Sequence, residues 1–308
     1  MSRDNLAAPF PYFGGKRRAA PIVWRALGDP AGYVEPFAGS AAVLLARPTF
    51  KGRRVETIND ADGWLVNAWR AITLSPHETA LHASGPVTEI DYHARLAWLQ
   101  ERRTPDLVAW LEGDPEAHDA KAAGWWLYVT ASGIGDPFGP GPWRVVDGRL
   151  ADTRKLPHLG NAGQGLIDYF DRLAHRLARV RITCGDWQRV AGPSVTRSGA
   201  GGDGSRAVFL DPPYSTSGDL YAESSEGISG EVRDWCLTPE AAGLRIILCG
   251  YDDEHDALLD HGWLTVEGKS GGGAGYSTNR SNGRRERLWL SPECIHQHQE
   301  TLDFGSTA

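Results

Sequence analysis

The chain has 308 residues, of which 41% are hydrophobic and 23% charged, so it is long enough for one large domain or two modest ones. This composition excludes a disordered chain, a coiled coil and a collagen. A net charge of -7 argues against a protein that coats nucleic acid through bulk positive charge. Of the 32 basic residues, 5 are Lys and 27 are Arg. This skew suits recognition of carboxylates or phosphates, and codon usage in a GC-rich genome explains it equally well.

The cysteines predict no metal site and no disulfide framework. They lie far apart in the chain, at Cys184, Cys236, Cys249 and Cys294. Without a CxxC pair this usage fits a reducing cytoplasm, and we expect His296 and His298 in the polar tail to be solvated. The N-terminus has no apolar signal segment, and no window reaches the ~18 consecutive apolar residues of a membrane span. We therefore expect a cytoplasmic protein without a metal.

Seven short apolar runs, bounded by Gly and Pro, have the character of β-strands. They cover residues 32–35, 54–59, 180–184, 207–210, 245–249, 264–266 and 287–290. Helical patterns follow three of them, at residues 41–46, 63–74 and 254–259. This alternation predicts an α/β sheet with helices on its faces.

The stretch 76–179 has a different pattern, with few strand candidates. Its helical patterns cover residues 89–103, 105–112, 116–131 and 164–178, and a Gly- and Pro-rich connection covers 133–142. We therefore predict a mainly helical insertion at 76–179, between residues 1–75 and 180–308 of one α/β domain. Three Gly- and Ser-rich segments, residues 192–205, 215–230 and 268–283, are predicted to be loops.

The most informative motif is Asp211-Pro212-Pro213-Tyr214, directly after the predicted strand at 207–210. A buried parallel strand would deliver it at its carboxyl end, where open α/β sheets bind ligands. The prolines hold the backbone extended, so the Asp211 carboxylate and the Pro212 carbonyl form a rigid pair of acceptors for an amino group. Tyr214 offers a ring that can stack on a planar substrate. Taken alone, the motif is equally compatible with a simple turn that ends a strand.

A second motif follows the first predicted strand and consists of Glu35-Pro36-Phe37-Ala38-Gly39-Ser40. Small residues allow the backbone to approach a ligand, and the helix start offers free N–H groups. Asp60 ends the next strand about 20 residues later, the position from which a carboxylate grips ribose hydroxyls in βαβ cofactor sites. A helix-capping role is the alternative for Asp60. Gly14-Gly15-Lys16 lacks the GxxxxGK[ST] frame, which excludes a P-loop.

Together these motifs resemble the Dam-like N6-adenine DNA methyltransferases of the alpha motif order. The resemblance rests on Tyr12 to Lys16, Glu35 to Ser40, Asn59-Asp60, Gly185-Asp186-Trp187 and Asp211 to Tyr214, which occur in the family's order. It implies a Rossmann-like class I S-adenosylmethionine-dependent methyltransferase sheet with a helical target-recognition insertion. It also implies a monomer that methylates the N6 amino group of a flipped adenine in duplex DNA, in a bacterial or phage-infected cell.

The resemblance assigns roles to individual residues. It implies S-adenosylmethionine contacts from Tyr12, Gly14, Gly15, Lys16, Glu35, Pro36, Phe37, Ala38, Gly39, Ser40, Asp60, Asp186 and Trp187. The catalytic motif is Asp211, Pro212, Pro213 and Tyr214. Two positions depart from the family's pattern, because Tyr12 stands where Trp is usual and Ala41 where a further Gly is common.

DNA contacts are expected from the helical insertion and from an Arg-rich loop. The candidates are Trp143, Arg144, Arg280, Arg284 and Arg285, clustered near Asp211. A solvated basic face is the alternative for the Arg-rich segment. A set of tryptophans in the insertion is expected to be core, namely Trp98, Trp110, Trp125 and Trp126.

Two other functions remain open at this point. The acceptor could be cytosine N4, RNA or a protein glutamine, although related motifs for these usually begin with Ser or Asn in place of Asp. The chain could also bind S-adenosylmethionine or DNA without turnover, and the intact motif at Asp211 to Tyr214 argues against this.

Overall fold

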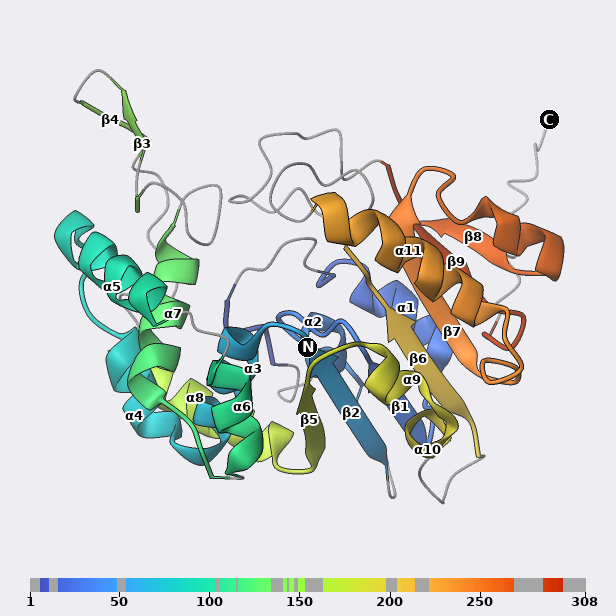
Figure 1. Ribbon diagram of the computed structural model, residues 1–308, viewed down its shortest axis with the longest axis horizontal. Coiled ribbons are helices and arrows are strands. Elements are labelled where there is room, and N and C mark those ends of the chain that lie inside the picture. The colour runs from blue at the N-terminus through green and yellow to red at the C-terminus, as the bar shows by residue number, and fades with distance from the viewer. Residues whose placement is uncertain are drawn as a thin grey trace, which may run out of the picture.

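The computed structural model describes residues 6–10, 16–48, 54–102, 106–114, 116–133, 141–142, 144–146, 149–152, 163–197, 204–213, 222–268 and 285–295. Within these ranges the chain forms a seven-stranded sheet flanked by helices (Figure 1). Among the described residues, no helix combines the length and the apolar character that crossing a bilayer requires. All four cysteines are buried, and none of them forms a disulfide bond.

The sheet contains the strands β1 (Gly32–Glu35), β2 (Val55–Asp60), β5 (Val180–Cys184), β6 (Arg206–Leu210), β7 (Arg245–Tyr251), β8 (Leu264–Glu267) and β9 (Glu286–Leu290). Their order is β5-β2-β1-β6-β7-β9-β8. The first five are parallel, whereas β9 is antiparallel to both of its neighbours. Each of these strands coincides with one predicted from the sequence, so the α/β class is confirmed.

The strand order reverses direction between β1 and β6. From β1 the chain moves outward through β2 to β5, and it then returns to β6 on the other side of β1. In open α/β sheets, ligands bind outside the carboxyl ends of the strands at such a switch point. Glu35 ends β1 and Asp211 directly follows β6, so the two motifs singled out in the sequence meet at this place.

The helices are α1 (Ala20–Leu27), α2 (Ala42–Leu45), α3 (Gly63–Leu74), α4 (Pro76–Ala83), α5 (Glu89–Glu101), α6 (Asp106–Gly113), α7 (Ala120–Ser132), α8 (Gly163–Leu177), α9 (Gln188–Ala191), α10 (Pro193–Thr196), α11 (Ala222–Cys236) and the 3-10 helix η1 (Asp256–His261). A separate antiparallel pair consists of β3 (Arg144–Val146) and β4 (Arg149–Asp152). Figure 1 shows α4 to α8 gathered at the β5 end of the sheet, with β8 and β9 at the opposite end.

Side chains alternate between two cores on the two faces of the sheet, as the twofold period of a strand requires. On β6, Phe209 belongs to the core that also contains residues of α1 to α5, α7 and α8. Val208 and Leu210 point to the other face, where α9, α11 and η1 pack. The helices between residues 76 and 179 thus share one core with the sheet; the proposed domain limits at 75 and 180 stay a prediction.

Local capping explains where several predicted helices begin. The side chains of Asp62, Thr88 and Asp119 accept hydrogen bonds from the backbone N–H groups two or three residues ahead, at the starts of α3, α5 and α7. α1 and α4 instead carry Pro in the first turn, where its missing N–H has no helical partner to lose. Neither of these two helices was predicted from the hydrophobic periodicity of the sequence.

The loop prediction for residues 215–230 is wrong over its second half, because α11 begins at Ala222. Its Gly- and Ser-rich sequence disfavours a helix, but Val232 and Cys236 are buried in the core of that face. Tertiary packing has therefore overridden the local propensity. The prediction for 192–205 is wrong at Pro193–Thr196, where α10 forms a single helical turn. Of the third segment, only Gly268 lies within the described residues.

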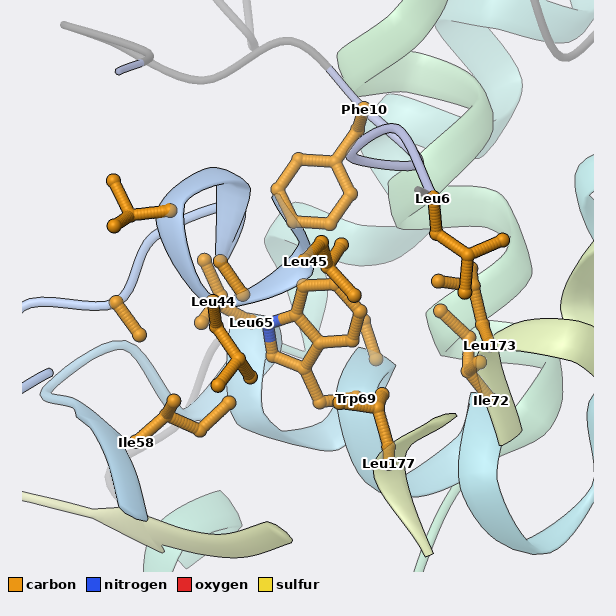
Figure 2. Packing of buried hydrophobic residues seen from close by; sticks show 14 of the residues in the cluster. Leu6, Phe10, Leu44, Leu45, Ile58, Leu65, Trp69, Ile72, Leu173 and Leu177 are labelled. Atoms are coloured by element: carbon orange, nitrogen blue, oxygen red, sulfur yellow. The ribbon is translucent and has the colours of Figure 1, made fainter. Parts of the chain in front are cut away.

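Trp69 of α3 connects the core to the loop that follows β1. Its ring is completely buried among aliphatic side chains and lies 5.6 Å from the ring of Phe10, centroid to centroid (Figure 2). Its indole Nε1 donates a 3.2 Å hydrogen bond to the carbonyl oxygen of Gly39. A rigid core side chain therefore holds the loop between β1 and α2 in place.

Candidate active site

The loop from Glu35 to Ser40 turns sharply between β1 and α2. Gly39 has a φ of 47° and Ala41 a φ of 50°, both in the left-handed region. Gly39 adopts this conformation without strain, whereas Ala41 does so at a cost of about 1 to 2 kcal/mol. Ala41 stands where the resembled methyltransferases commonly have Gly, and its backbone keeps the left-handed conformation that Gly favours. The amide of Ala38 donates to the carbonyl of Asn59 over 2.9 Å, which ties the loop to β2.

Asp60 closes this loop from the end of β2. Its carboxylate accepts hydrogen bonds from the Gly39 amide at 2.9 Å and from the Asp62 amide at 3.0 Å. Burial raises the pKa of Asp60 to about 6, against the lowering effect of these hydrogen bonds. The helix-cap alternative for Asp60 is wrong, because Asp62 caps α3 through its bond to the Trp64 amide.

Glu35 lies in the protein interior, with 2% of its surface exposed. Its Oε2 accepts from the Tyr33 hydroxyl at 3.0 Å and from the Leu44 amide, in the short helix α2, at 3.2 Å. Burial outweighs these two bonds and raises the pKa of Glu35 to about 8. The carboxyl group is therefore mostly protonated at neutral pH, and it stabilises the turn from within.

Asp186 and Trp187 follow β5 and lie beside the same loop. The exposed Asp186 carboxylate accepts from the amide of Gln188 at 2.8 Å. The Trp187 ring is buried and stacks against Phe37, with the centroids 6.1 Å apart and the planes at 30°. The buried Trp187 Nε1 has no hydrogen-bond partner among the described residues. The Phe37–Trp187 pair, with an indole N–H that makes no hydrogen bond to the described residues, thus lies beside the loop that follows β1.

Asn59 joins the ends of three strands, a role that the sequence did not reveal. Its Nδ2 donates to the carbonyls of Pro36 at 3.1 Å and of Gly185 at 2.9 Å. Its Oδ1 accepts from the Thr183 hydroxyl at 2.9 Å. The side chain is 1% exposed, so it ties the loops after β1 and β5 to β2 in a dry environment. The sequence pattern favours the neighbouring Asp60 as a site residue, because carboxylates are the usual ligands of ribose hydroxyls.

Asp211 takes part in a buried ionic cluster with Lys16 and Glu286. The Lys16 ammonium lies 2.8 Å from Asp211 Oδ1 and 2.6 Å from Glu286 Oε1. The Asp211 side chain is 17% exposed, whereas those of Lys16 and Glu286 are almost fully buried. The nearby carboxylates raise the pKa of Lys16 despite the opposing effect of burial, so this side chain is charged. Lys16, which the resemblance assigned to the cofactor, contacts the Asp of the Asp211–Tyr214 motif.

Cys249 of β7 borders this cluster. Its thiol is completely buried, and its pKa is raised well above the ordinary value by burial and by the Asp211 carboxylate. A buried thiol of this kind is a neutral, inert neighbour. Pro212 is buried and Pro213 exposed, so the chain reaches the surface two residues after Asp211.

Of the proposed DNA contacts, Arg285 has a described side chain. Its Nε lies 2.6 Å from the Asp252 carboxylate, and its guanidinium lies 5.3 Å from the Tyr251 ring centroid. It precedes Glu286 in the chain and therefore lies at the edge of the cluster. The other proposed residues are outside the described part of the chain: Tyr12, Gly14, Gly15, Trp143, Tyr214, Arg280, Arg284 and the side chain of Arg144.

The tryptophans of the helical region differ in burial. Trp126 is fully buried, which confirms its core assignment. Trp98 and Trp125 are half-buried, lie edge to face at 4.9 Å and carry the Lys121 ammonium over their rings. Trp110 is 45% exposed, so its core assignment is wrong.

No family model matches the chain, and no curated protein matches it in sequence. Among the described residues, no group of three His, Cys, Asp or Glu side chains is arranged to hold a metal ion.

Proposed function

We propose that the protein transfers a methyl group from S-adenosylmethionine to the exocyclic N6 amino group of an adenine in DNA. The observation that carries this proposal is the position of the Asp211 carboxylate. It lies at the carboxyl end of β6, at the switch point of the sheet, and it is held by Lys16 beside the loop that follows β1. The resemblance in five ordered motifs adds the reaction type.

The residues around the loop after β1 fit the proposed cofactor. The stacked Phe37 and Trp187 rings suit a purine, and the unsatisfied Trp187 Nε1 suits one of its acceptors. The left-handed turn at Gly39 brings backbone close to the site, and Asp60 at its base can accept from ribose hydroxyls. S-adenosylmethionine, when bound, supplies an electrophilic methyl group on a positively charged sulfur.

The chain's own groups prepare the amino nitrogen for attack. An exocyclic amine is a poor nucleophile because its lone pair is delocalised into the ring. Asp211 and the Pro212 carbonyl accept its two N–H groups, which favours a pyramidal nitrogen and frees the lone pair. The amine nitrogen then bonds to the methyl carbon as the carbon–sulfur bond breaks, the neutral thioether leaves, and the methylated amine loses one proton to solvent. This step depends on positioning and electrostatics, without a covalent enzyme intermediate. The target base is flipped out of the duplex, and Tyr214 is the residue expected to stack on it.

A methyl-transfer assay with radiolabelled S-adenosylmethionine and unmethylated duplex DNA tests the proposal. The wild-type chain is expected to label the DNA, and Asp211→Asn to lower the rate by a factor of about 100 or more. Asp260→Asn, a change at an exposed carboxylate in η1, is the matched control and should label at the wild-type rate.

The acceptor is varied in the same assay. Label in RNA or in a protein glutamine, with none in DNA, would replace the proposed acceptor and keep the reaction type. Binding of S-adenosylmethionine without transfer to any of these acceptors would favour the non-catalytic alternative.

A further inference from the structure

Glu286, the first residue of β9, reaches the same edge of the sheet as Asp211 although its strand runs in the opposite direction. Because β9 is antiparallel to β7, Glu286 pairs with Tyr251 at the carboxyl end of β7. Its backbone is fixed on the other side by the Gly268 amide, which donates to the Glu286 carbonyl over 2.9 Å. Glu286 was not predicted as a site residue, because it lies at the start of a strand and directly after the Arg-rich segment that was assigned to DNA contacts.

The Glu286 carboxylate shares Lys16 with Asp211. Its side chain is 2% exposed, so it is placed in the interior at a large cost in hydration that only a close cation offsets. Lys16 is that cation, at 2.6 Å, and it also contacts Asp211 at 2.8 Å. One positive charge therefore stands between two carboxylates.

The charge of the cluster matters for the proposed reaction. A pair of Lys16 and Asp211 would be neutral, whereas the cluster of Lys16, Asp211 and Glu286 has one net negative charge. Methyl transfer to a neutral amine moves positive charge onto the amine nitrogen, which is the atom that Asp211 faces. A net negative charge fixed a few ångströms away in a poorly hydrated site stabilises that developing charge.

We propose that Glu286 is a positioning residue for the reaction: it balances Lys16, so that the cluster keeps one net negative charge and the Asp211 carboxylate keeps its orientation toward the amino group. This inference rests on the proposed function. Other titratable groups that act on the cluster are Glu35 of β1, and Cys249 and Tyr251 of β7. Glu35 and Cys249 are both mostly neutral at pH 7 because burial raises their pKa values, and Glu286 is therefore the group that supplies the second negative charge.

Steady-state kinetics of single and double variants test the role of Glu286. Glu286→Gln is expected to lower kcat by about 10- to 100-fold with little change in the Kd of S-adenosylmethionine, because the charge is lost near the amine and away from the Phe37–Trp187 stack. Glu286→Asp keeps the charge and should recover part of the rate. Glu267→Gln on β8, at an exposed carboxylate, is the matched control and should leave kcat unchanged.

The pH profile separates electrostatics from a merely structural effect. Lys16→Met leaves two buried carboxylates together, so one of them takes up a proton and the activity profile moves to higher pH. Glu286→Gln removes one carboxylate and cannot move the profile in that direction. The double variant Lys16→Met/Glu286→Gln should therefore show a smaller alkaline shift than Lys16→Met.

Titration of the Asp211 carboxyl by carbon NMR, assigned by its loss in Asp211→Asn, gives a readout that needs no turnover. Removing the Glu286 charge should lower the pKa of Asp211, and removing the Lys16 charge should raise it. Equal kcat in wild type and Glu286→Gln would overturn the inference while the proposed function stands. If the wild type transfers no methyl group, the proposed function fails and the role of Glu286 in the reaction fails with it. An unchanged Asp211 titration in Glu286→Gln, with an active wild type, would overturn the inference alone.

Discussion

At the scale of single residues, Asn59 connects two loops of the candidate site through one side chain. One amide side chain fixes the loop after β1 through Pro36 and the loop after β5 through Gly185. Both loops carry residues that we assign to S-adenosylmethionine, on the two sides of the site. The geometry of the proposed cofactor site therefore depends on a residue that need not contact the cofactor.

Asn59→Ala should raise the Kd of S-adenosylmethionine by roughly tenfold, as two loops lose their common anchor, and should cost about 1 to 3 kcal/mol of stability through the unpaired carbonyls. Calorimetric titration and chemical denaturation measure the two effects. Asn67→Ala is the matched control, because the buried Asn67 likewise bonds backbone groups, those of Asp119, but it does so between α3 and the start of α7. Asn67→Ala should lose similar stability and keep its affinity for S-adenosylmethionine. Equal losses of this affinity in Asn59→Ala and Asn67→Ala would contradict the role of Asn59.

Glu35 gives the protein a stability that depends on pH. Its pKa is raised in the folded state from 4.5 to about 8, so folding binds a proton between these values. The stabilisation is complete below pH 4.5 and is lost as the pH rises through about 8. Asp60, whose pKa is raised from 3.8 to about 6, adds a change of the same sign at lower pH.

In Glu35→Gln, the loss of stability between pH 5 and pH 8 should therefore shrink, by an amount on the order of a few kcal/mol. Urea denaturation at several pH values measures the slope, with the exposed Glu240→Gln as the control. Parallel curves for wild type and Glu35→Gln would show that the Glu35 carboxyl is ionised at neutral pH.

At the scale of elements, α4 and α7 pack unusually closely. A Cβ atom at Gly124 of α7 would lie 2.4 Å from His82 Cβ and 2.7 Å from the Thr79 carbonyl oxygen, both in α4. Only Gly allows this approach of α4 and α7, which both contribute to one core with α3.

Gly124→Ala should lower the free energy of unfolding by about 1 to 3 kcal/mol, because the two helices must move apart. Gly165→Ala in α8 is the matched control, since a Cβ there meets nothing within 4 Å. It should stabilise the protein by up to about 1 kcal/mol through helix propensity. Thermal denaturation of both variants measures the difference, and a Gly124→Ala variant as stable as Gly165→Ala would contradict the close packing.

The seven strands were predictable because each is a short apolar run between Gly and Pro, which is the general sequence pattern of a strand. The helix α11 was not predictable in this way. Its sequence is rich in Ser and Gly, and it is stabilised by the burial of Val232 and Cys236 against a sheet face that is assembled from distant strands. Local pattern therefore identified the sheet and missed a helix that depends on tertiary packing.

The residues of the candidate site likewise include some that the sequence predicts and some that it does not. The acidic residues Glu35, Asp60 and Asp211 could be selected because each ends or follows a strand, and parallel strands end at one edge of the sheet. Glu286 could not be selected, because it starts an antiparallel strand and reaches that edge from the other direction. The contact between Lys16 and Asp211 could not be predicted either, because nothing in the spacing of the two residues specifies it.

At the scale of the whole molecule, the fold brings charges of both signs to one edge despite a net charge of -7. Lys16 lies between two carboxylates in the interior, and Arg285 lies at their border beside Asp252. An enzyme that acts on one base needs local cations around its cleft and rapid release of the DNA, which a modest overall negative charge does not oppose. The net charge therefore limits bulk coating of nucleic acid without excluding DNA as a substrate.

The central claim is that Asp211 prepares an adenine amino group for methylation, and the identity of the methylated nucleoside tests it most directly. Duplex DNA incubated with the protein and labelled S-adenosylmethionine is digested to nucleosides and separated by chromatography with mass detection. The account predicts label in N6-methyldeoxyadenosine, formed at equal rates by the wild type and Asp260→Asn and more slowly, by a factor of about 100 or more, by Asp211→Asn. Label in N4-methyldeoxycytidine, or equal N6-methyldeoxyadenosine from wild type and Asp211→Asn, would contradict it.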